Sequence, residues 1–336
     1  MDSLTHVVLG GSVAHLFWHK SLGRKSFAFG AILGTLPDLD IIFYPFLNQT
    51  QKLYWHRGEF HSIFFIFLAS FLITKIFAKK SATYNLSEKR LFAGLFFIFF
   101  THVAIDYFTV YGTQILSPVS RYGFARGNLF IIDPMYTIPL LLGMLTALLI
   151  NEKARFKASL TGILISSVYL LFSLGSHFYA DHLFKKQLAS KNIKPSKSIT
   201  SATPMNTLLW RHLSLTDKGI LVGYFSLISK NSKDEIKFDL IKRNEELIKP
   251  FENQPNIKAI KWFSKGFWVA ELKDDVLTVS DLRFGELRPF KNSSPDEWEY
   301  LFTWKMGKNP NGLKHKRDRE ISYKTALGVL WERLRG

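Results

Sequence analysis

Six long runs of apolar residues, with few charged residues inside them, occupy the first half of this chain. Each run is close to the roughly 20 residues that an α-helix needs to cross the hydrocarbon core of a bilayer. We therefore predict an α-helical multi-pass membrane domain. The first run carries three histidines and two glycines and also fits a re-entrant helix, so we expect five or six transmembrane helices. The runs are 4–19, 26–44, 61–78, 91–109, 133–150 and 159–178.

The second half of the chain has the composition of a domain in water, because charged residues recur throughout it. Short stretches rich in β-branched and aromatic residues predict strands, and two others, 234–252 and 321–335, predict helical or mixed pieces. We expect a transmembrane domain over 1–182, a basic, serine-rich linker over 183–204 and a small soluble α+β domain over 205–336. The predicted strands are 219–229, 258–263, 267–273, 276–281 and 299–306.

The net charge of +17 is spread over both halves, and no nucleic-acid-binding motif accompanies it, so we expect no nucleic-acid partner. In the first half the basic residues concentrate in alternate connections between the apolar runs. By the positive-inside rule these connections face the cytoplasm, and the opposite helix ends and the C-terminal domain face outward. The predicted cytoplasmic residues are Lys20, Arg24, Lys25, Lys75, Lys79, Lys80, Lys89, Arg90, Lys153, Arg155 and Lys157.

Acidic and imidazole side chains gather at the outward end of the predicted helices. They come from five stretches that are far apart in the sequence, whereas a random scatter would place them at both ends. Such groups are costly near the hydrocarbon core unless they pair with one another or with a cation. The residues are His6, Asp38, Asp40, His56, Arg57, His61, His102, Asp106 and Asp133.

A bound divalent metal ion would neutralise these residues together. His102 and Asp106 are four residues apart in an apolar helix, so both project from one helix face. The chain has Cys 0, so any metal must be held by nitrogen and oxygen atoms. Imidazole with carboxylate suits zinc, manganese or iron, and a catalytic zinc keeps one position open for water. We therefore predict a divalent metal site, with zinc favoured over manganese or iron.

Simpler structural roles stay open for the same residues. His102 and Asp106 also fit a helix-stabilising ion pair. The Pro37–Asp40 segment also fits a helix-terminating loop, and Arg57 also fits a contact with lipid headgroups at the membrane surface. These roles would all have to coincide at one end of the helices, which favours the metal site.

Three residues, one of them already in this set, have no single assigned role. His177 and Asp181 repeat the four-residue spacing at the outer end of the last apolar run. They fit an additional ligand, a support for one, or a cap at the membrane exit. Asp133 opens the fifth run and is placed to orient a ligand.

Five short motifs together resemble a known family. Their order and spacing are similar to those of the YdjM-type membrane-bound metal-dependent hydrolases of bacteria, over residues 1 to about 180. The resemblance implies an enzyme of the cytoplasmic (inner) membrane. The motifs are Met1–His6, Gly34–Asp40, His56–Ser62, Thr101–Asp106 and Thr109–Thr113. The metal ligands that the resemblance implies are His6, Asp38, Asp40, His56, His61, His102 and Asp106.

A looser similarity concerns the zinc-dependent phospholipase C and nuclease class, which also contains a His-x-x-x-Asp helix pair like that of His102 and Asp106. We therefore expect a hydrolase in which a metal-activated water cleaves a phosphoester or other ester of a lipid or lipid-linked substrate. Asp38 or Asp40 would bridge metals or act as the base, and Arg57 would stabilise an anionic oxygen. Two other classes compete: a transporter or metal-handling protein that uses the same residues, and a non-catalytic scaffold.

Overall fold

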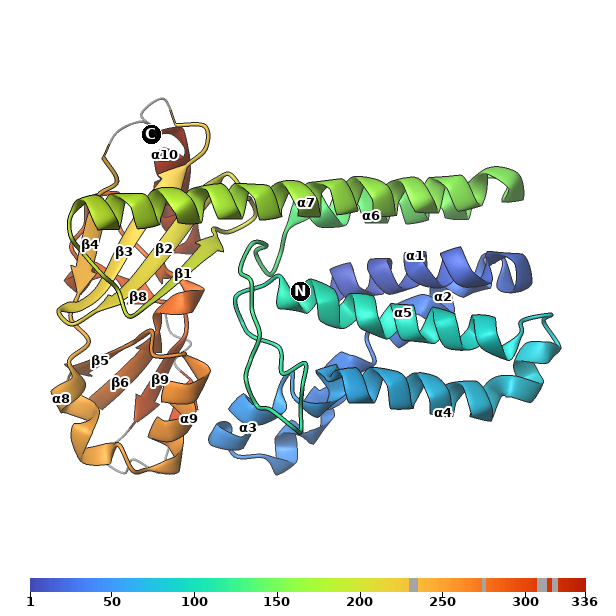
Figure 1. The fold of residues 1–336 in the computed structure, drawn as a ribbon, viewed down its shortest axis with the longest axis horizontal. Helices are drawn as coiled ribbons and strands as arrows, with labels where there is room; N and C mark the ends of the chain where they lie inside the picture. Colours follow the sequence, from blue (N-terminus) through green and yellow to red (C-terminus); the bar gives the residue numbers. More distant parts are fainter. Residues whose placement is uncertain (230–234, 274–275, 307–312, 316–319) are drawn as a thin grey trace. The chain divides into compact units, whose positions relative to one another are not determined.

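The computed structural model describes residues 1–229, 235–273, 276–306, 313–315 and 320–336. These residues form two compact units. The first unit is helical and contains Met1–Tyr44, Trp55–Leu174 and Pro204–Asn206. The second contains Pro45–Tyr54, Gly175–Thr203 and Thr207–Gly336 and carries the β-sheets (Figure 1). A helical first half followed by a sheet-containing C-terminal domain is therefore confirmed.

The helices of the first unit lie side by side, and several of them meet at a shared end. α1, α4 and α6 begin at this end, whereas α2 and α5 finish there (Figure 1). Loops and short 3₁₀ helices gather at the same place, so it is where residues distant in sequence can meet. The elements are α1 (Ser3–Leu22), α2 (Lys25–Gly34), η1 (Pro37–Phe46), η2 (Glu59–His61), α4 (Ile63–Ala82), α5 (Glu88–Tyr107), α6 (Pro134–Leu149) and the first part of α7 (Glu152–Ser190).

Two of the described helices, α5 and α7, are long and apolar enough to cross a membrane. Two bent pairs pass the same test only when their members are taken together. α2 and η1 meet at 44°, and the Gln49–His61 segment meets α4 at 53°. The described residues therefore offer two spans, or up to four if each bent pair is one span. The expected count of five or six is not confirmed.

The expected run 26–44 is divided between two helices that meet at a bend. α2 ends at Gly34, and the chain continues from Pro37 as the 3₁₀ helix η1. Proline lacks a backbone N–H and disfavours helical dihedrals in the residue before it, so a helix stops readily at this point. The break turns Asp38 and Asp40 away from the axis of α2.

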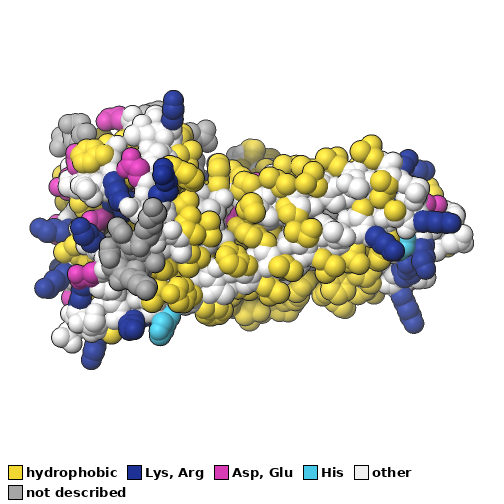
Figure 2. Space-filling model, turned by 90° about the horizontal axis from the view of Figure 1, so that it is seen from above, with side chains coloured by type: hydrophobic (Ala, Val, Ile, Leu, Met, Phe, Trp, Pro, Cys, Tyr) yellow, Lys and Arg dark blue, Asp and Glu magenta, His cyan; other side chains and the backbone are white. Residues whose placement is uncertain are grey.

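The outer surface of the helical unit is apolar. Large hydrophobic side chains on α4 and α7, such as Phe67, Ile76 and Val168, are more than half exposed. Figure 2 shows hydrophobic side chains across the helices on the face in view, with Lys and Arg gathered at the right-hand tip of the helices. Exposed apolar surface of this extent is normal for helices that face lipid and unusual for a domain in water.

α1 and α2 pack against each other through glycines with almost no space between their backbones. A Cβ atom added to Gly10 would lie 2.5 Å from the carbonyl oxygen of Gly30 and 2.8 Å from the Cα of Gly34. A Cβ on Gly34 would lie 2.7 Å from the carbonyl oxygen of His6. Small residues four apart are a common means of close helix packing in membranes. This contact brings the start of α1 against the end of α2.

The second unit contains two four-stranded antiparallel sheets and a two-stranded ribbon. The strand orders are β1-β2-β3-β4, β10-β9-β6-β5 and β7-β8. The strands are β1 (Lys197–Ala202), β2 (Leu209–Thr216), β3 (Gly219–Ser226), β4 (Phe238–Ile241), β5 (Trp268–Lys273), β6 (Val276–Asp281), β7 (Glu286–Leu287), β8 (Glu299–Tyr300), β9 (Thr303–Met306) and β10 (Leu313–His315). The helices are α3 (Gln49–Trp55, all but its last residue), α8 (Glu245–Ile248), η3 (Lys249–Phe251), α9 (Pro255–Phe263), η4 (Leu282–Phe284), η5 (Pro295–Glu297) and α10 (Tyr323–Arg335).

Several expectations for this half need correction. The expected linker 183–204 is largely regular structure, because α7 continues to Ser190 and 197–202 form β1. The stretch 258–263 is not a strand but part of α9, where Pro255 at the first turn and buried Ile257, Ile260 and Phe263 follow a helical spacing. The piece 234–252 is mixed, with β4, α8 and η3, and its residue 234 lies outside the described residues.

A buried ion-pair network stabilises the second unit. The Glu286 carboxylate lies 2.6 Å from Nη2 of Arg211 and 2.8 Å from Nη2 of Arg288. The hydroxyl of Tyr224 donates to Oε1 of Glu286 at 2.8 Å, and the Arg288 guanidinium lies 3.4 Å from the ring centre of Trp298. A buried carboxylate is tolerated when cations and donors surround it in this way.

Candidate metal centre

Four side chains from three elements bring their donor atoms together at the shared end of the helical unit. They are Asp38 in the first turn of η1, His61 at the end of η2, and His102 and Asp106 near the end of α5. One donor atom from each lies within 4.8 Å of all the others. No second group of this kind occurs in the part of the chain that the structure describes. The side chain of Asp38 is 27% exposed, and the other three are almost fully buried.

The distances within this group match those between the ligands of one metal ion. His61 Nε2 lies 3.2 Å from His102 Nε2, 3.4 Å from Asp38 Oδ1 and 3.4 Å from Asp106 Oδ2. His102 Nε2 lies 3.6 and 3.7 Å from the same two carboxylate oxygens. Ligands in a tetrahedron around zinc lie roughly 3.3–3.5 Å apart, given zinc–ligand bonds of about 2.0–2.2 Å. The four residues therefore fit a single divalent ion.

A backbone hydrogen bond sets which nitrogen of His102 faces the group. Its Nδ1 donates to the carbonyl oxygen of Gly34 at 2.7 Å. Since Nδ1 carries the proton, neutral His102 presents a lone pair at Nε2. A metal-ligating histidine usually has its other ring nitrogen engaged in this manner, which fixes the ring orientation. The tight packing of α1 and α2 thus supplies an acceptor for this ring.

Asp40 lies behind His61 and does not belong to the four-residue group. Its carboxylate is fully buried and accepts a hydrogen bond from the backbone N–H of Arg57 at 3.0 Å. Nδ1 of His56 lies 3.2 Å from both of its oxygens, and Nδ1 of His61 lies 3.8 Å from Oδ2. Asp40 therefore ties the His56–His61 segment together. His56 reaches Asp40 and stays outside the group.

Arg57 is buried next to Asp106. Its Nη2 lies 2.9 Å from Asp106 Oδ1, and its Nη1 donates to the hydroxyl of Thr109 at 2.9 Å. The guanidinium lies 4.9 Å from the ring centre of Tyr111. The backbone of Arg57 has φ 54°, a left-handed conformation that costs free energy in a residue other than glycine. The surrounding contacts therefore hold Arg57 against a local preference.

His6 and the chain's first residue complete the surroundings of Asp106. The ring of His6 stacks on His102 with centroids 3.6 Å apart, and its Nε2 lies 3.3 Å from Asp106 Oδ1 and 3.9 Å from Asp38 Oδ2. Both ring nitrogens of His6 are buried without a hydrogen-bond partner among the described residues. The α-amino group of Met1 also pairs with Asp106 Oδ1. His6 is thus adjacent to the four-residue group and faces the other oxygen of each carboxylate.

The remaining sequence candidates have other partners. Asp133 caps α6 by accepting from the N–H of Met135, and it also accepts from the hydroxyl of Tyr169 at 3.0 Å. In the second unit, His177 Nε2 donates to the carbonyl oxygen of Thr200 at 3.0 Å, and Asp181 accepts from the Thr200 hydroxyl at 2.8 Å. None of the three joins the metal group.

Sequence reasoning missed two contributors to the centre. The Gly34 carbonyl that accepts from His102 leaves no side-chain signal in the sequence. Thr109, which accepts from Arg57, lies at the start of the Thr109–Thr113 motif, and that motif was the only pointer to it.

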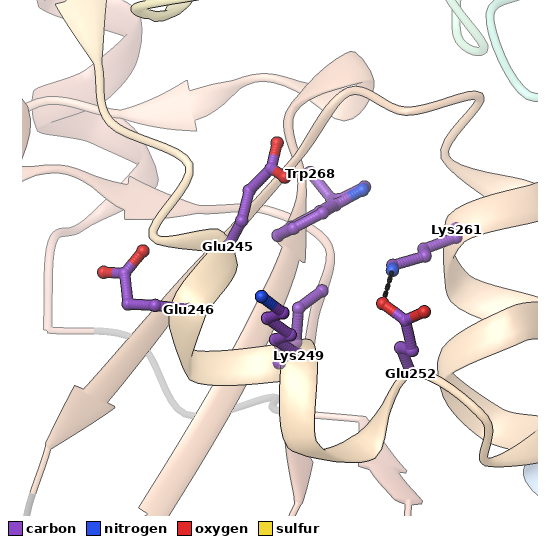
Figure 3. Close-up of a pocket in the computed structure, with 7 residues that line it drawn as sticks. Glu245, Glu246, Lys249, Glu252, Lys261 and Trp268 are labelled. Atoms are coloured by element: carbon purple, nitrogen blue, oxygen red, sulfur yellow. Dashed lines mark ion pairs between the residues drawn. The ribbon is translucent and has the colours of Figure 1, made fainter.

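A pocket in the second unit offers no comparable donor set. It has a volume of about 380 Å³, and Glu252 pairs with Lys261 at 3.9 Å on its wall (Figure 3). The Arg243 guanidinium lies 4.2 Å from the ring centre of Trp268, which also lines the pocket. No histidine occurs among its lining residues. The helical unit therefore carries the candidate site.

A protein-family model described as YdjM inner membrane protein matches residues 1–182, which is more than half of the chain. The chain belongs to the YdjM family. The match confirms the resemblance seen in the motifs. The YdjM description also places the family in the inner membrane, in agreement with the apolar helices. No curated protein and no solved structure matches the chain.

Proposed function

We propose that this YdjM protein is a membrane-embedded metal-dependent hydrolase that cleaves a phosphoester or other ester in a lipid or lipid-linked substrate. The observation that carries the proposal is the set of four donor atoms with separations of 3.2–3.7 Å around His61 and His102. Asp106 Oδ2 supports it, because this buried oxygen accepts no hydrogen bond from the described residues. A cation at this position would satisfy it.

Zinc is the metal we favour, with manganese or iron as alternatives, because the donors are two imidazoles and two carboxylates. When bound, such an ion lowers the pKa of a coordinated water toward neutrality and polarises the bond under attack. Asp38, His61, His102 and Asp106 would hold it, and because a catalytic zinc keeps one position for water, partly exposed Asp38 would be the ligand that gives up its place. His6 lies beside them, close to the carboxylate oxygens that face away from His61 and His102.

The other residues have distinct proposed roles. Asp38 is the better candidate for a base, because it is partly exposed whereas the Asp40 carboxylate is buried and bonded to the Arg57 backbone. Asp40 would hold the orientation of His61. Arg57 would keep Asp106 charged and in place, and it would face an anionic oxygen only if its pairing with Asp106 loosened.

A lipid or lipid-linked substrate suits a site at one end of apolar helices, since such substrates arrive by diffusion within the membrane. The similarity of the His102–Asp106 pair to the phospholipase C class favours a phosphoester. The competing class, a transporter or metal-handling protein, needs polar groups along the membrane depth. The metal-group residues lie at one end of the helices, which favours hydrolysis.

The proposal is tested on the full chain in detergent by elemental analysis and by a panel of phosphodiesters and phospholipids with and without chelator. We expect at least about one divalent ion bound per chain. We also expect hydrolysis of a substrate in the panel, and we expect the chelator to abolish it. Asp106→Ala and His102→Ala should lose both, whereas His19→Ala, at the other end of α1, should lose neither. If Asp106→Ala and His102→Ala both kept their full metal content, these residues would not be metal ligands. Metal without turnover on any substrate would favour metal handling.

A further inference from the structure

Access to the metal group is one-sided. Among its four residues only Asp38 is appreciably exposed, at 27%, while His61, His102 and Asp106 are sealed within the unit. Any substrate must therefore approach past Asp38. The side chains around Asp38 then decide what kind of molecule can approach.

The residues that follow Asp38 are large, apolar and exposed. Leu39 is 45% exposed and Ile42 60%, and Ile41 and Phe43 are exposed to a similar extent. We call these four side chains the η1 ridge. In a 3₁₀ helix, residues three apart lie on the same side, so Ile41 is aligned with Asp38, and Ile42 with Leu39. The ridge thus begins beside the one open ligand.

The η1 ridge continues the lipid-facing surface of the preceding helix. On α2, Phe29 and Ile32 are also at least half exposed, and η1 follows α2 after the 44° bend. Apolar side chains line most ligand pockets, but here they are exposed at the surface and follow a helix whose own apolar side chains face outward. No charged residue lies between exposed Ile32 on α2 and Asp38, since Gly30 to Pro37 contains none.

η2, which carries the ligand His61, also carries a charged residue. Glu59, two residues before His61, pairs with Arg121, and both side chains are partly exposed. Charged groups therefore stand close in sequence to one ligand, and apolar groups close to another. Such a division matches a molecule that has both an apolar chain and a polar headgroup.

Resting on the proposed function, we infer that the substrate is a membrane lipid that approaches laterally, with its acyl or prenyl chain on the η1 ridge. The bond cut then lies at the junction of chain and headgroup. The reaction consumes one water: its oxygen bonds to the phosphorus or carbonyl carbon, and the bond from that atom to the ester oxygen breaks. One proton of the water goes to that oxygen, and the other is released with the new acid.

The first test compares long and short chains on the same headgroup. Dioleoyl phosphatidylglycerol in nanodiscs and its soluble dibutyryl analogue are assayed with wild type, Leu39→Asn, Ile42→Asn and the control Ile76→Asn, which changes an apolar residue on α4 that is even more exposed, at 72%. We expect the ridge variants to lose about tenfold on the long-chain lipid and much less on the short one, as loss of one apolar contact predicts. Ile76→Asn should match wild type. Equal losses on both substrates would overturn the inference.

A second test does not depend on turnover. Native mass spectrometry of chelator-treated protein, taken from dioleoyl phosphatidylglycerol nanodiscs, measures how much lipid stays bound. Wild type and Ile76→Asn should retain more lipid than Leu39→Asn and Ile42→Asn. Equal retention in all four would refute lipid binding on the ridge, even if metal-dependent hydrolysis is found. Selective loss without hydrolysis would support the ridge and count against the hydrolase.

Discussion

The ring of His102 donates through Nδ1 to the carbonyl oxygen of Gly34, 2.7 Å away. That carbonyl lies where α2 ends against α1, and the two helices meet there through glycines. The orientation of a proposed metal ligand thus depends on a backbone contact between two other helices. Helix packing and metal binding should therefore respond together to one substitution.

Gly34→Ala tests this dependence. The new Cβ would lie 2.7 Å from the His6 carbonyl oxygen and 3.0 Å from Gly10 Cα, so α1 and α2 must separate. We expect metal affinity to fall about 10- to 100-fold, as for other losses of a ligand's supporting hydrogen bond. Titration of metal into the apoprotein measures this. Gly175→Ala is the matched control, because nothing lies within 4 Å of its added Cβ. Equal metal affinities in Gly34→Ala and Gly175→Ala would show that metal binding does not depend on the packing of α1 against α2.

Arg57 and Thr109 should act on stability as one unit. Arg57→Met leaves the Asp106 carboxylate with the Met1 α-amino group but without its buried guanidinium, and it should destabilise the protein by about 3–5 kcal/mol. Thr109→Val removes one acceptor for the guanidinium and should cost about 1–2 kcal/mol. In the double variant the Thr109 effect should largely vanish, because its partner is already absent. Unfolding midpoints in detergent measure all three, and strictly additive effects would contradict the coupling.

The Glu286 network should make the protein sensitive to acid. Burial alone would raise the pKa of Glu286, but Arg211 and Arg288, with the Tyr224 hydroxyl, lower it from 4.5 to about 2. A carboxyl whose pKa is lower in the folded state stabilises that state fully above pH 4.5, and this contribution is lost as the pH falls toward 2. About 3 kcal/mol is at stake.

Tryptophan fluorescence is a suitable measurement, since Trp298 contacts Arg288 in the same network. Between pH 4.5 and 2 the unfolding midpoint of wild type should drop. Glu286→Gln should be less stable than wild type at pH 7 and should change less over that acid range. An unchanged acid response in this variant would assign the effect to other carboxyls.

The orientation inferred from basic residues can be tested with single cysteines, because the natural chain has Cys 0. Val119, 81% exposed, lies in a connection predicted to face outward, and exposed Thr83 lies in one predicted to face the cytoplasm. A membrane-impermeant maleimide should label Val119→Cys in intact cells and Thr83→Cys only after permeabilisation. The reverse labelling pattern would show that the protein has the opposite orientation in the membrane.

Much of the centre was predictable because ionisable residues stand out in apolar sequence. His6, Asp38, His61, His102 and Asp106 were all expected at one end of the helices, and the structure brings them together there. The sequence did not predict which residues supply donor atoms to the metal group and which only hold those residues in place. Asp38 and Asp40 are two residues apart in the same motif. The 3₁₀ geometry of η1 points Asp38 toward the metal group and places Asp40 behind His61.

The C-terminal half was harder because its patterns are ambiguous. The α9 stretch 258–263 is rich in Ile, Trp and Phe, which favour strands, yet its helix is set by Pro255 and by burial along one face. β1 reads as a polar linker, since Ser and Thr dominate it, but pairing with β2 buries its last three residues. Tertiary contacts decided both cases.

The left-handed backbone of Arg57 restricts how this loop can vary among relatives or in design. Glycine or asparagine would suit φ 54° but would leave the carboxylate of Asp106 without its guanidinium partner. Lysine would keep the positive charge, but it would also keep the backbone cost and could not contact Asp106 and Thr109 together with two nitrogens. No single exchange meets both demands. A tolerated change here should therefore come paired with a compensating one at Asp106, and such covariation would be its signature in an alignment.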